Sequence, residues 1–192
     1  PAAAIAYSDK GAKVKLASGQ PLEADDVVLS VPPSVWKRIA FDPPLPAGLA
    51  PQMGSNIKFL AAVKKRFWEK DKLSQYALSD GPVGMTWEGT DNQLGDGKAC
   101  MVAFSGANAA ETCRGWPAGE RNENYVAELS KMYPKFKDNF EGARFMDWPS
   151  DPWTSAGYSF PAPGQVTTLG PLLRQGLERL HLHDVARGLR LE

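Results

Sequence analysis

A single lysine, Lys58, lies in the middle of an otherwise apolar segment and is the side chain best placed for chemistry. Around it, every second residue is apolar, which predicts one buried face of a β-strand, formed by Ile57, Phe59, Ala61 and Val63. Lys58 falls on the opposite face, and a lysine is almost never fully buried unless it is paired. Either this face is wet and Lys58 is solvated, or Lys58 points into a pocket and holds a water or a cofactor atom. The pattern alone leaves both readings open.

A second candidate is the segment 147–164, which is dense in Trp, Pro, Gly, Ser and Tyr. A stiff aromatic loop of this kind suits the wall of a binding pocket. The alternative is a loop whose rings only pack against one another, and composition does not separate the two.

Other reactive side chains are sparse. Two cysteines, Cys100 and Cys113, form neither a disulfide framework nor a zinc site, and we expect Cys100 to pack as a small hydrophobic residue. The two histidines, His181 and His183, are best explained as exposed residues at a strand end, so we expect no metal centre. A Ser–His–Asp order and a GxGxxG motif are both missing from the sequence.

Composition narrows the functional classes further. The 192 residues carry 22 basic and 22 acidic side chains, and zero net charge removes the bulk electrostatic case for nucleic acid as a partner. The basic triplet Lys64–Arg66 is therefore interpreted as a solvated strand end. No apolar run reaches the length of about 18 residues that a membrane span needs, so we expect a soluble protein, with the cytoplasm favoured. Because the chain starts at Pro1, we expect a fragment or a processed chain.

Hydrophobic periodicity predicts an α+β fold with a mixed, largely antiparallel β-sheet flanked by helices. Within the expected strand 26–31, the run Val27–Val31 is of the continuous apolar kind that a strand buried on both faces shows. The proline-rich segment 41–46 predicts a stiff connector between two lobes. The expected strands are 4–8, 12–17, 26–31, 57–63, 74–79, 83–88, 99–104, 144–148 and 179–182, with 74–104 as an antiparallel meander. The expected helices are 34–40, 120–133 and 169–177.

Several of these segments together resemble the flavin-containing amine oxidases, the group of monoamine and polyamine oxidases. The segments that carry the resemblance are Ala24–Pro33, Phe41–Pro46, Met53–Lys58, Phe67–Trp68 and Asp151–Gly164. Their order and spacing match the second half of that family. The resemblance implies two lobes: residues 1–40 as a remnant of the FAD-binding lobe with a small β excursion, 41–155 as the substrate-binding lobe, and 156–192 as a segment that returns toward the FAD lobe.

The resemblance also implies an activity. Enzymes of this family oxidise an amine by moving a hydride equivalent to FAD, and reoxidation by oxygen releases hydrogen peroxide. Lys58 matches the lysine that holds a water near the flavin, and Tyr158 matches an aromatic residue that faces the flavin and flanks the amine. Both are the expected catalytic and cofactor-contacting residues, and Trp153 and Phe160 are weaker candidates for substrate binding.

Two departures from the family pattern bear on whether this chain binds FAD and on its alternative function. The glycine-rich fingerprint for the FAD pyrophosphate is missing, and the segment 182–188 replaces the closing motif of the family. We therefore expect that the chain alone holds FAD poorly, and that it pairs either with a chain that carries the FAD lobe or with a second copy of itself. The alternative function is a flavin-free, catalytically inactive domain that binds a small molecule or a protein partner.

Overall fold

The computed structural model describes residues 1–93 and 97–183, and residues 94–96 and 184–192 lie outside this description. The segment 184–188 of the atypical end is therefore among the residues that are not described. The chain divides into two compact units, each presented here by itself. The central unit is Ser55–Pro149, and the split unit is built from Pro1–Gly54 and Ser150–Glu192.

The central unit is organised around a five-stranded antiparallel sheet with the strand order β11-β7-β10-β9-β8. Its strands are β7 (Asn56–Val63), β8 (Ala77–Leu78), β9 (Met85–Glu88), β10 (Ala99–Gly106) and β11 (Phe140–Asp147). Neighbouring strands β8, β9 and β10 follow one another in the chain, which confirms the expected meander. The alternation read from the sequence is also confirmed, since Ile57, Phe59, Ala61 and Val63 are all 0% exposed.

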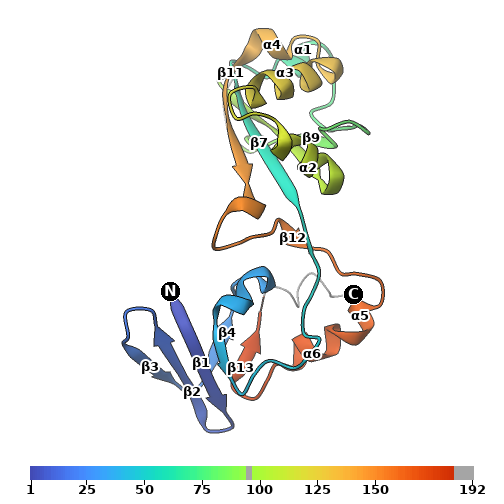
Figure 1. Ribbon diagram of the computed structural model, residues 1–192. Helices are drawn as coiled ribbons and strands as arrows, with labels where there is room; N and C mark the ends of the chain where they lie inside the picture. The colour runs from blue at the N-terminus through green and yellow to red at the C-terminus, as the bar shows by residue number, and fades with distance from the viewer. Residues whose placement is uncertain (94–96, 184–192) are drawn as a thin grey trace. The chain divides into compact units, whose positions relative to one another are not determined.

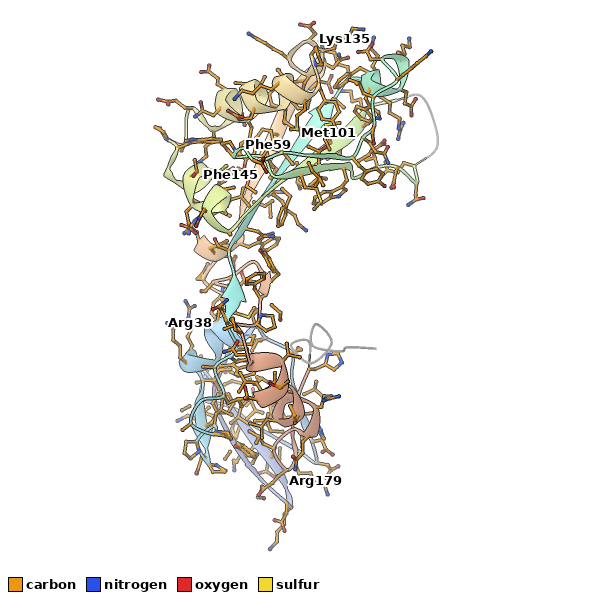
Figure 2. All side chains as sticks on the ribbon, turned by 90° about the vertical axis from the view of Figure 1, so that its right-hand side faces the viewer. Arg38, Phe59, Met101, Lys135, Phe145 and Arg179 are labelled. Carbon is orange, nitrogen blue, oxygen red and sulfur yellow. The ribbon has the colours of Figure 1, made fainter. Side chains whose placement is uncertain are left out.

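Helices cover one face of this sheet, and Figure 1 shows α2 and α3 beside β7. They are α1 (Phe67–Lys70), α2 (Ala107–Gly115), α3 (Arg121–Met132) and α4 (Phe136–Asn139). The buried residues of these helices form one hydrophobic core with the sheet residues Phe59 and Met101, which Figure 2 labels. Phe59 stacks on Tyr125 of α3 with a centroid separation of 4.2 Å, so the middle of β7 is fixed against the helix layer.

The described residues of the split unit form three small sheets. A four-stranded sheet has the order β3-β2-β1-β5, and two further pairs are β13-β4 and β12-β6. The strands are β1 (Ala2–Ser8), β2 (Gly11–Leu16), β3 (Pro21–Ala24), β4 (Val27–Leu29), β5 (Ala40–Asp42), β6 (Met53–Gly54), β12 (Tyr158–Ser159) and β13 (Leu180–Leu182). The helices are the short 3₁₀ turn η1 (Pro33–Arg38), α5 (Gln165–Thr168) and α6 (Gly170–Gln175), and the 3₁₀ turn η2 (Trp148–Ser150) spans the boundary between the two units. Trp36, Leu173 and Leu180 belong to the separate hydrophobic core of this unit.

The observed elements confirm the general fold class and correct three details. The run Val27–Val31 is not buried on both faces, because Val28 is 58% exposed and only Val27–Leu29, strand β4, is regular. The proline-rich segment 41–46 does not connect the two units, because it lies wholly inside the split unit, where Ala40–Asp42 pairs in parallel with β1. The third detail is Arg66, which is not solvated: its side chain is 15% exposed and pairs with Glu88 at 2.7 Å.

None of the helices within residues 1–93 and 97–183 has the length and the apolar composition that crossing a lipid bilayer requires.

Candidate functional site

Lys58 lies on the face of the central sheet that the helices do not cover. The strand alternates without a break from Asn56 to Val63, so Lys58 points away from the core that its neighbours Ile57 and Phe59 join. Its cross-strand partners are Phe104 on β10 and Met146 on β11. The Lys58 Nζ lies 5.8 Å from the centroid of the Trp87 ring, a distance at which a cation and an indole attract each other.

The side chains around Lys58 form an apolar surface that we call the Lys58 face. Strand register places its members on the same side of the sheet. They are Lys58 and Leu60 on β7, Met85 and Trp87 on β9, Val102 and Phe104 on β10, and Met146 on β11. Trp87 and Phe104 lie 6.4 Å apart between ring centroids, so the lysine stands beside a small aromatic group.

Two polar features distinguish this face from a simple apolar sheet. Among the described residues, Lys58 forms no ion pair. Asn56, two residues earlier on the same face, is only 4% exposed, and its Oδ1 atom has no hydrogen-bond partner. A buried acceptor without a donor is costly, which makes Asn56 a functional candidate that the sequence pattern did not single out.

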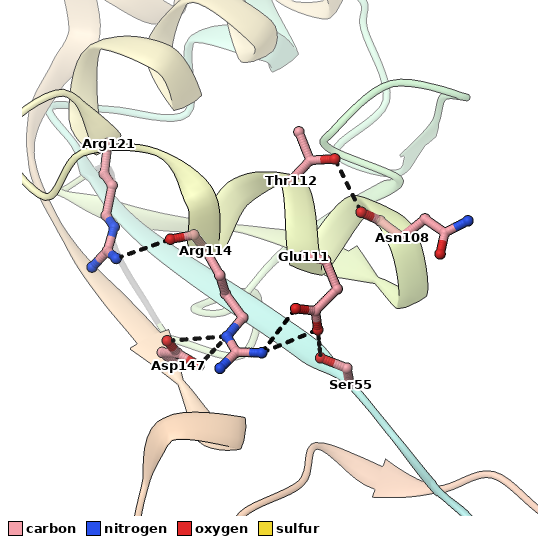
Figure 3. A network of polar contacts seen from close by, with 7 residues as sticks. All are labelled: Ser55, Asn108, Glu111, Thr112, Arg114, Arg121 and Asp147. Atoms are coloured by element: carbon pink, nitrogen blue, oxygen red, sulfur yellow. Dashed lines mark hydrogen bonds and ion pairs between the residues drawn. The ribbon is translucent and has the colours of Figure 1, made fainter.

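A network of ionic and polar contacts fixes the start of β7, which carries Lys58, and the end of its neighbour β11 (Figure 3). Arg114 of α2 pairs with Asp147 at the end of β11 at 3.1 Å and with Glu111 at 3.0 Å. Ser55, just before β7, donates its hydroxyl hydrogen to Glu111 at 2.8 Å. Because Asp147 pairs with Ile57 across the sheet, the network holds both strands at the level of Lys58.

In the split unit, Tyr158 is held against the backbone of Gly54. The two residues pair across β6 and β12, and the amide of Gly157 donates to the carbonyl of Gly54 at 2.7 Å. A Cβ atom on Gly54 would lie 2.7 Å from Cε2 and Cζ of the Tyr158 ring. Glycine is therefore required here by the close approach of the ring. Phe160 stands edge-to-face to Tyr158 at 6.0 Å.

Trp153 belongs to a separate turn, which Asp151 organises. One oxygen of Asp151 accepts hydrogen bonds from the amides of Trp153 and Thr154 at 2.8 and 3.0 Å. These contacts, the Trp153 amide first, lower the pKa of the Asp151 carboxyl below its usual value. Trp153 is 60% exposed as a residue, and Phe160 is 56% exposed.

The structure therefore brings Tyr158 and Phe160 into one aromatic pair and keeps Trp153 on its own turn of the same unit. Lys58 belongs to the central unit. The catalytic and binding roles of these four residues stay predictions. Sequence reasoning missed Asn56 and Trp87, although the alternation of β7 already placed Asn56 on the same face as Lys58.

The donor groups of the described residues fit only part of a flavin. The Lys58 ammonium group has no acidic partner among the described residues and is therefore a suitable donor to the polar edge of a flavin ring. The Tyr158 ring is held in place against Gly54 and is therefore a suitable contact for a flat ligand. A glycine-rich loop at a helix N-terminus, which would hold the phosphates, is not present in the sequence. Across residues 1–93 and 97–183, no group of three His, Cys, Asp or Glu side chains could hold a metal ion.

Comparisons with known proteins agree on one family. The family model described as flavin containing amine oxidoreductase matches residues 1–184. An L-amino acid dehydrogenase of Synechocystis is 26% identical over 92% of this chain and 38% of its own length. The putrescine oxidase of Kocuria rosea is 32% identical over 72% of this chain and 30% of its own length. The chain thus spans about a third of the length of these relatives.

A comparison of structures gives the same result. The solved structure of a wild-type putrescine oxidase bound to putrescine superimposes with a TM-score of 0.81 at 25% identity, covering 98% of this chain and 47% of that one. Members of the matched family are FAD flavoproteins, which agrees with the cofactor expected from the sequence. The chain belongs to the family of flavin-containing amine oxidoreductases.

Proposed function

We propose that this chain forms the substrate-binding part of an FAD-dependent amine oxidase and takes part in the oxidative deamination of an amine with release of hydrogen peroxide. One observation carries the proposal: Lys58 stands on an apolar, aromatic sheet face without an ion-pair partner among the described residues. A cation in such a place needs polar partners, and a water together with a flavin edge would provide them.

In this proposal the central unit is the core of the substrate lobe, and the split unit belongs to the FAD lobe. FAD, when bound, supplies the acceptor for the two electrons of the amine. The Lys58 ammonium would hold a water beside the reacting centre, and Tyr158 and Phe160 would orient the neutral amine with their ring faces. Trp153 would contact the substrate from its turn. The phosphates of FAD would be held by a segment that carries the missing glycine-rich loop.

The second candidate is a flavin-free domain that binds a small molecule or a protein partner. A companion chain with the FAD lobe, or a second copy of this chain, would be the partner in either case.

Flavin retention and peroxide formation separate the two functions. The chain is joined to a segment that carries the glycine-rich FAD loop, purified, mixed with FAD, freed of unbound cofactor and examined for the visible absorption of bound flavin, and amines are then added while hydrogen peroxide is measured. An oxidase predicts a yellow protein whose turnover falls at least tenfold in Lys58→Met. The control is Lys64→Met. Lys64 is an exposed lysine just after the same strand, and its ammonium group donates a hydrogen bond to the carbonyl of Asp138. Colourless protein that forms no peroxide would support the flavin-free domain.

A further inference from the structure

One cavity of the central unit, which we call the lysine cavity, is lined mostly by lysines. It has a volume of about 390 Å³ and lies where the end of β7 leads into α1. Its lining residues are Lys64, Lys65, Phe67, Lys70, Lys135, Asp138 and Asn139. All of them belong to the central unit, so the lysine cavity is independent of the proposed function, in which FAD belongs to the split unit.

Contacts with the core fix the walls of this cavity. Figure 1 shows α1 and α4 at the same end of the central unit, and Phe67 of α1 packs edge-on against Phe136 of α4 with a centroid separation of 6.2 Å. The backbone amide of Lys64 donates to the carbonyl of Asn139 at 2.9 Å. The Asn139 side chain, in a residue only 6% exposed, donates to the carbonyl of Lys135 at 2.8 Å. The lysines therefore project from a defined backbone.

Positive charge is concentrated at this end of a chain whose net charge is zero. The segment 64–72 carries five basic and two acidic side chains, and the segment 131–138 carries three basic and one acidic side chain. Phe67, which is 2% exposed, adds an apolar wall. A cleft that is lined by one sign of charge and has an apolar wall concentrates the electrostatic field inside it.

Two of the four lysines are already engaged by protein groups. The Lys64 ammonium donates to the backbone carbonyl of Asp138 at 2.8 Å, and it therefore closes the wall of the cavity. The Lys135 ammonium pairs with Asp71, which offsets part of its charge. Because an ammonium group has three donors, Lys135 keeps the capacity to bind a ligand as well.

Lys65 and Lys70 have no acidic partner among the described residues. Ammonium groups that share one small cavity repel one another, and an anion between them would remove this cost. The four lysines and the single aspartate of the lining leave three positive charges, before the contact of Lys135 with Asp71 is considered. One phosphate group carries about 1.5–2 negative charges at neutral pH, so about two phosphate groups balance this lining.

We propose that the lysine cavity binds a compact anion with two linked phosphate groups, held by Lys65, Lys70 and Lys135. Charge-assisted hydrogen bonds from ammonium groups to phosphate oxygens supply the binding energy. A small enclosed site suits such a group, whereas a nucleic-acid strand needs a groove that follows its backbone. The phosphates belong either to a soluble molecule or to the headgroup of a lipid.

A titration of the full chain without FAD tests this site. Inorganic pyrophosphate is added while calorimetry records binding and NMR records the side-chain amide of Asn139, which lines the cavity. The side-chain amide of Asn56, 4% exposed in the same unit and not part of the lining, is the reference signal. We expect pyrophosphate to shift Asn139 at a concentration at least tenfold below that of sulfate, with Asn56 unchanged.

Variants assign the binding to the proposed lysines. The double variant Lys65→Gln/Lys70→Gln should weaken pyrophosphate binding at least tenfold. Lys137→Gln is the matched control, because Lys137 is an exposed lysine of α4 outside the lining, and it should change binding less than twofold. Asp138→Asn should tighten binding, because it removes the acid of the lining and keeps the backbone carbonyl that Lys64 needs.

Vesicles distinguish the two sources of phosphate. Phosphatidylcholine vesicles are compared with and without phosphatidylinositol bisphosphate. Binding of pyrophosphate and of the bisphosphate vesicles supports the site and assigns a lipid headgroup, and binding of pyrophosphate alone supports the site and assigns a soluble ligand. No response to pyrophosphate, an equal response to sulfate, which means an adventitious ion only, or an equal loss in Lys137→Gln overturns the proposal. No flavin is present in any of these titrations, so their outcome is separate from that of the oxidase test.

Discussion

The contact between Gly54 and Tyr158 is the tightest constraint on a single residue in the aromatic region. We expect Gly54→Ala to displace the Tyr158 ring and to destabilise the split unit by about 1–3 kcal/mol, because the new methyl group would lie 2.7 Å from two ring atoms. Urea unfolding measures the loss of stability.

Two further variants test whether the ring is the cause. Gly119→Ala is the control, since a Cβ there meets nothing within 4 Å. Adding Tyr158→Ala to Gly54→Ala should recover most of the lost free energy, because it removes the clash. A Gly54→Ala protein that is as stable as the parent would show that the ring is not held against this backbone.

A buried ion pair is the corresponding feature of the central unit. Glu88, with a side chain 2% exposed, pairs with Arg66 at 2.7 Å and also accepts a hydrogen bond from Thr90 at 2.9 Å. Glu88→Gln should destabilise the central unit by about 3 kcal/mol, because the Arg66 charge loses its buried partner. Chemical unfolding of the variant measures this difference.

The matched control is an exposed pair. Lys13 and Glu23 lie 3.0 Å apart with side chains 57% and 77% exposed, so Glu23→Gln should change the free energy of unfolding by less than about 1 kcal/mol. If Glu23→Gln and Glu88→Gln lowered the free energy of unfolding by similar amounts, burial would not explain the effect of Glu88→Gln. Replacing both Arg66 and Glu88 by apolar residues should cost less than the single change.

At the scale of residues, the local sequence pattern predicted the strand face on which a side chain lies better than it predicted the residues that surround this side chain. Alternation along 57–63 was enough to place Lys58 opposite a buried face, because strand side chains alternate strictly. It could not show that Trp87 lies under the ammonium group, since that contact depends on the pairing of β10 with both β7 and β9. Arg66 was misjudged for the same reason: its partner Glu88 is 22 residues away in the chain.

At the scale of elements, the stability of the turn that Asp151 organises and that carries Trp153 depends on pH. The hydrogen bonds from Trp153 and Thr154 lower the pKa of Asp151 from 3.8 in the folded state. Its stabilising effect is therefore fully present above pH 3.8 and is lost as the pH falls through the lower folded pKa. An NMR titration of the Trp153 and Thr154 amides should give a common midpoint below 3.8.

Asp151→Asn should abolish this titration while it keeps an acceptor oxygen. The amide of Lys10 serves as the comparison, because it donates at 3.2 Å to the hydroxyl of Ser8, which does not titrate in this range. A midpoint at or above 3.8, or one that persists in Asp151→Asn, would contradict the hydrogen bonding of the turn.

The predicted helices and strands were accurate where apolar residues recur with a regular period over one long continuous segment. The helix expected at 120–133 is α3, Arg121–Met132, and the strand expected at 99–104 is β10, Ala99–Gly106. The helix α2 was not predicted, because it buries only Ala110 and Cys113 and so shows no apolar stripe. The pairing of β4 with β13 could not be predicted either, since it joins residues about 150 positions apart.

For the whole molecule, the path of the chain separates the two units. The central unit is one continuous segment with its own sheet and core, whereas the split unit needs both ends of the described chain. The sequence predicted lobe limits at 41 and 155 from family likeness. The boundaries by compactness lie at Gly54/Ser55 and Pro149/Ser150, and which unit serves FAD and which serves substrate stays a proposal.

Separate cores predict separate unfolding. Residues 55–149 expressed alone should fold, because the strands β7–β11 and the helices α1–α4 find all their sheet and core partners inside this segment. In the full chain, urea unfolding should show two transitions. Glu88→Gln should lower the midpoint of one and Gly54→Ala the midpoint of the other, as expected for independent sites. Tryptophan fluorescence and circular dichroism together would resolve the transitions. If both variants moved one shared transition and residues 55–149 failed to fold, the two units would form a single cooperative structure.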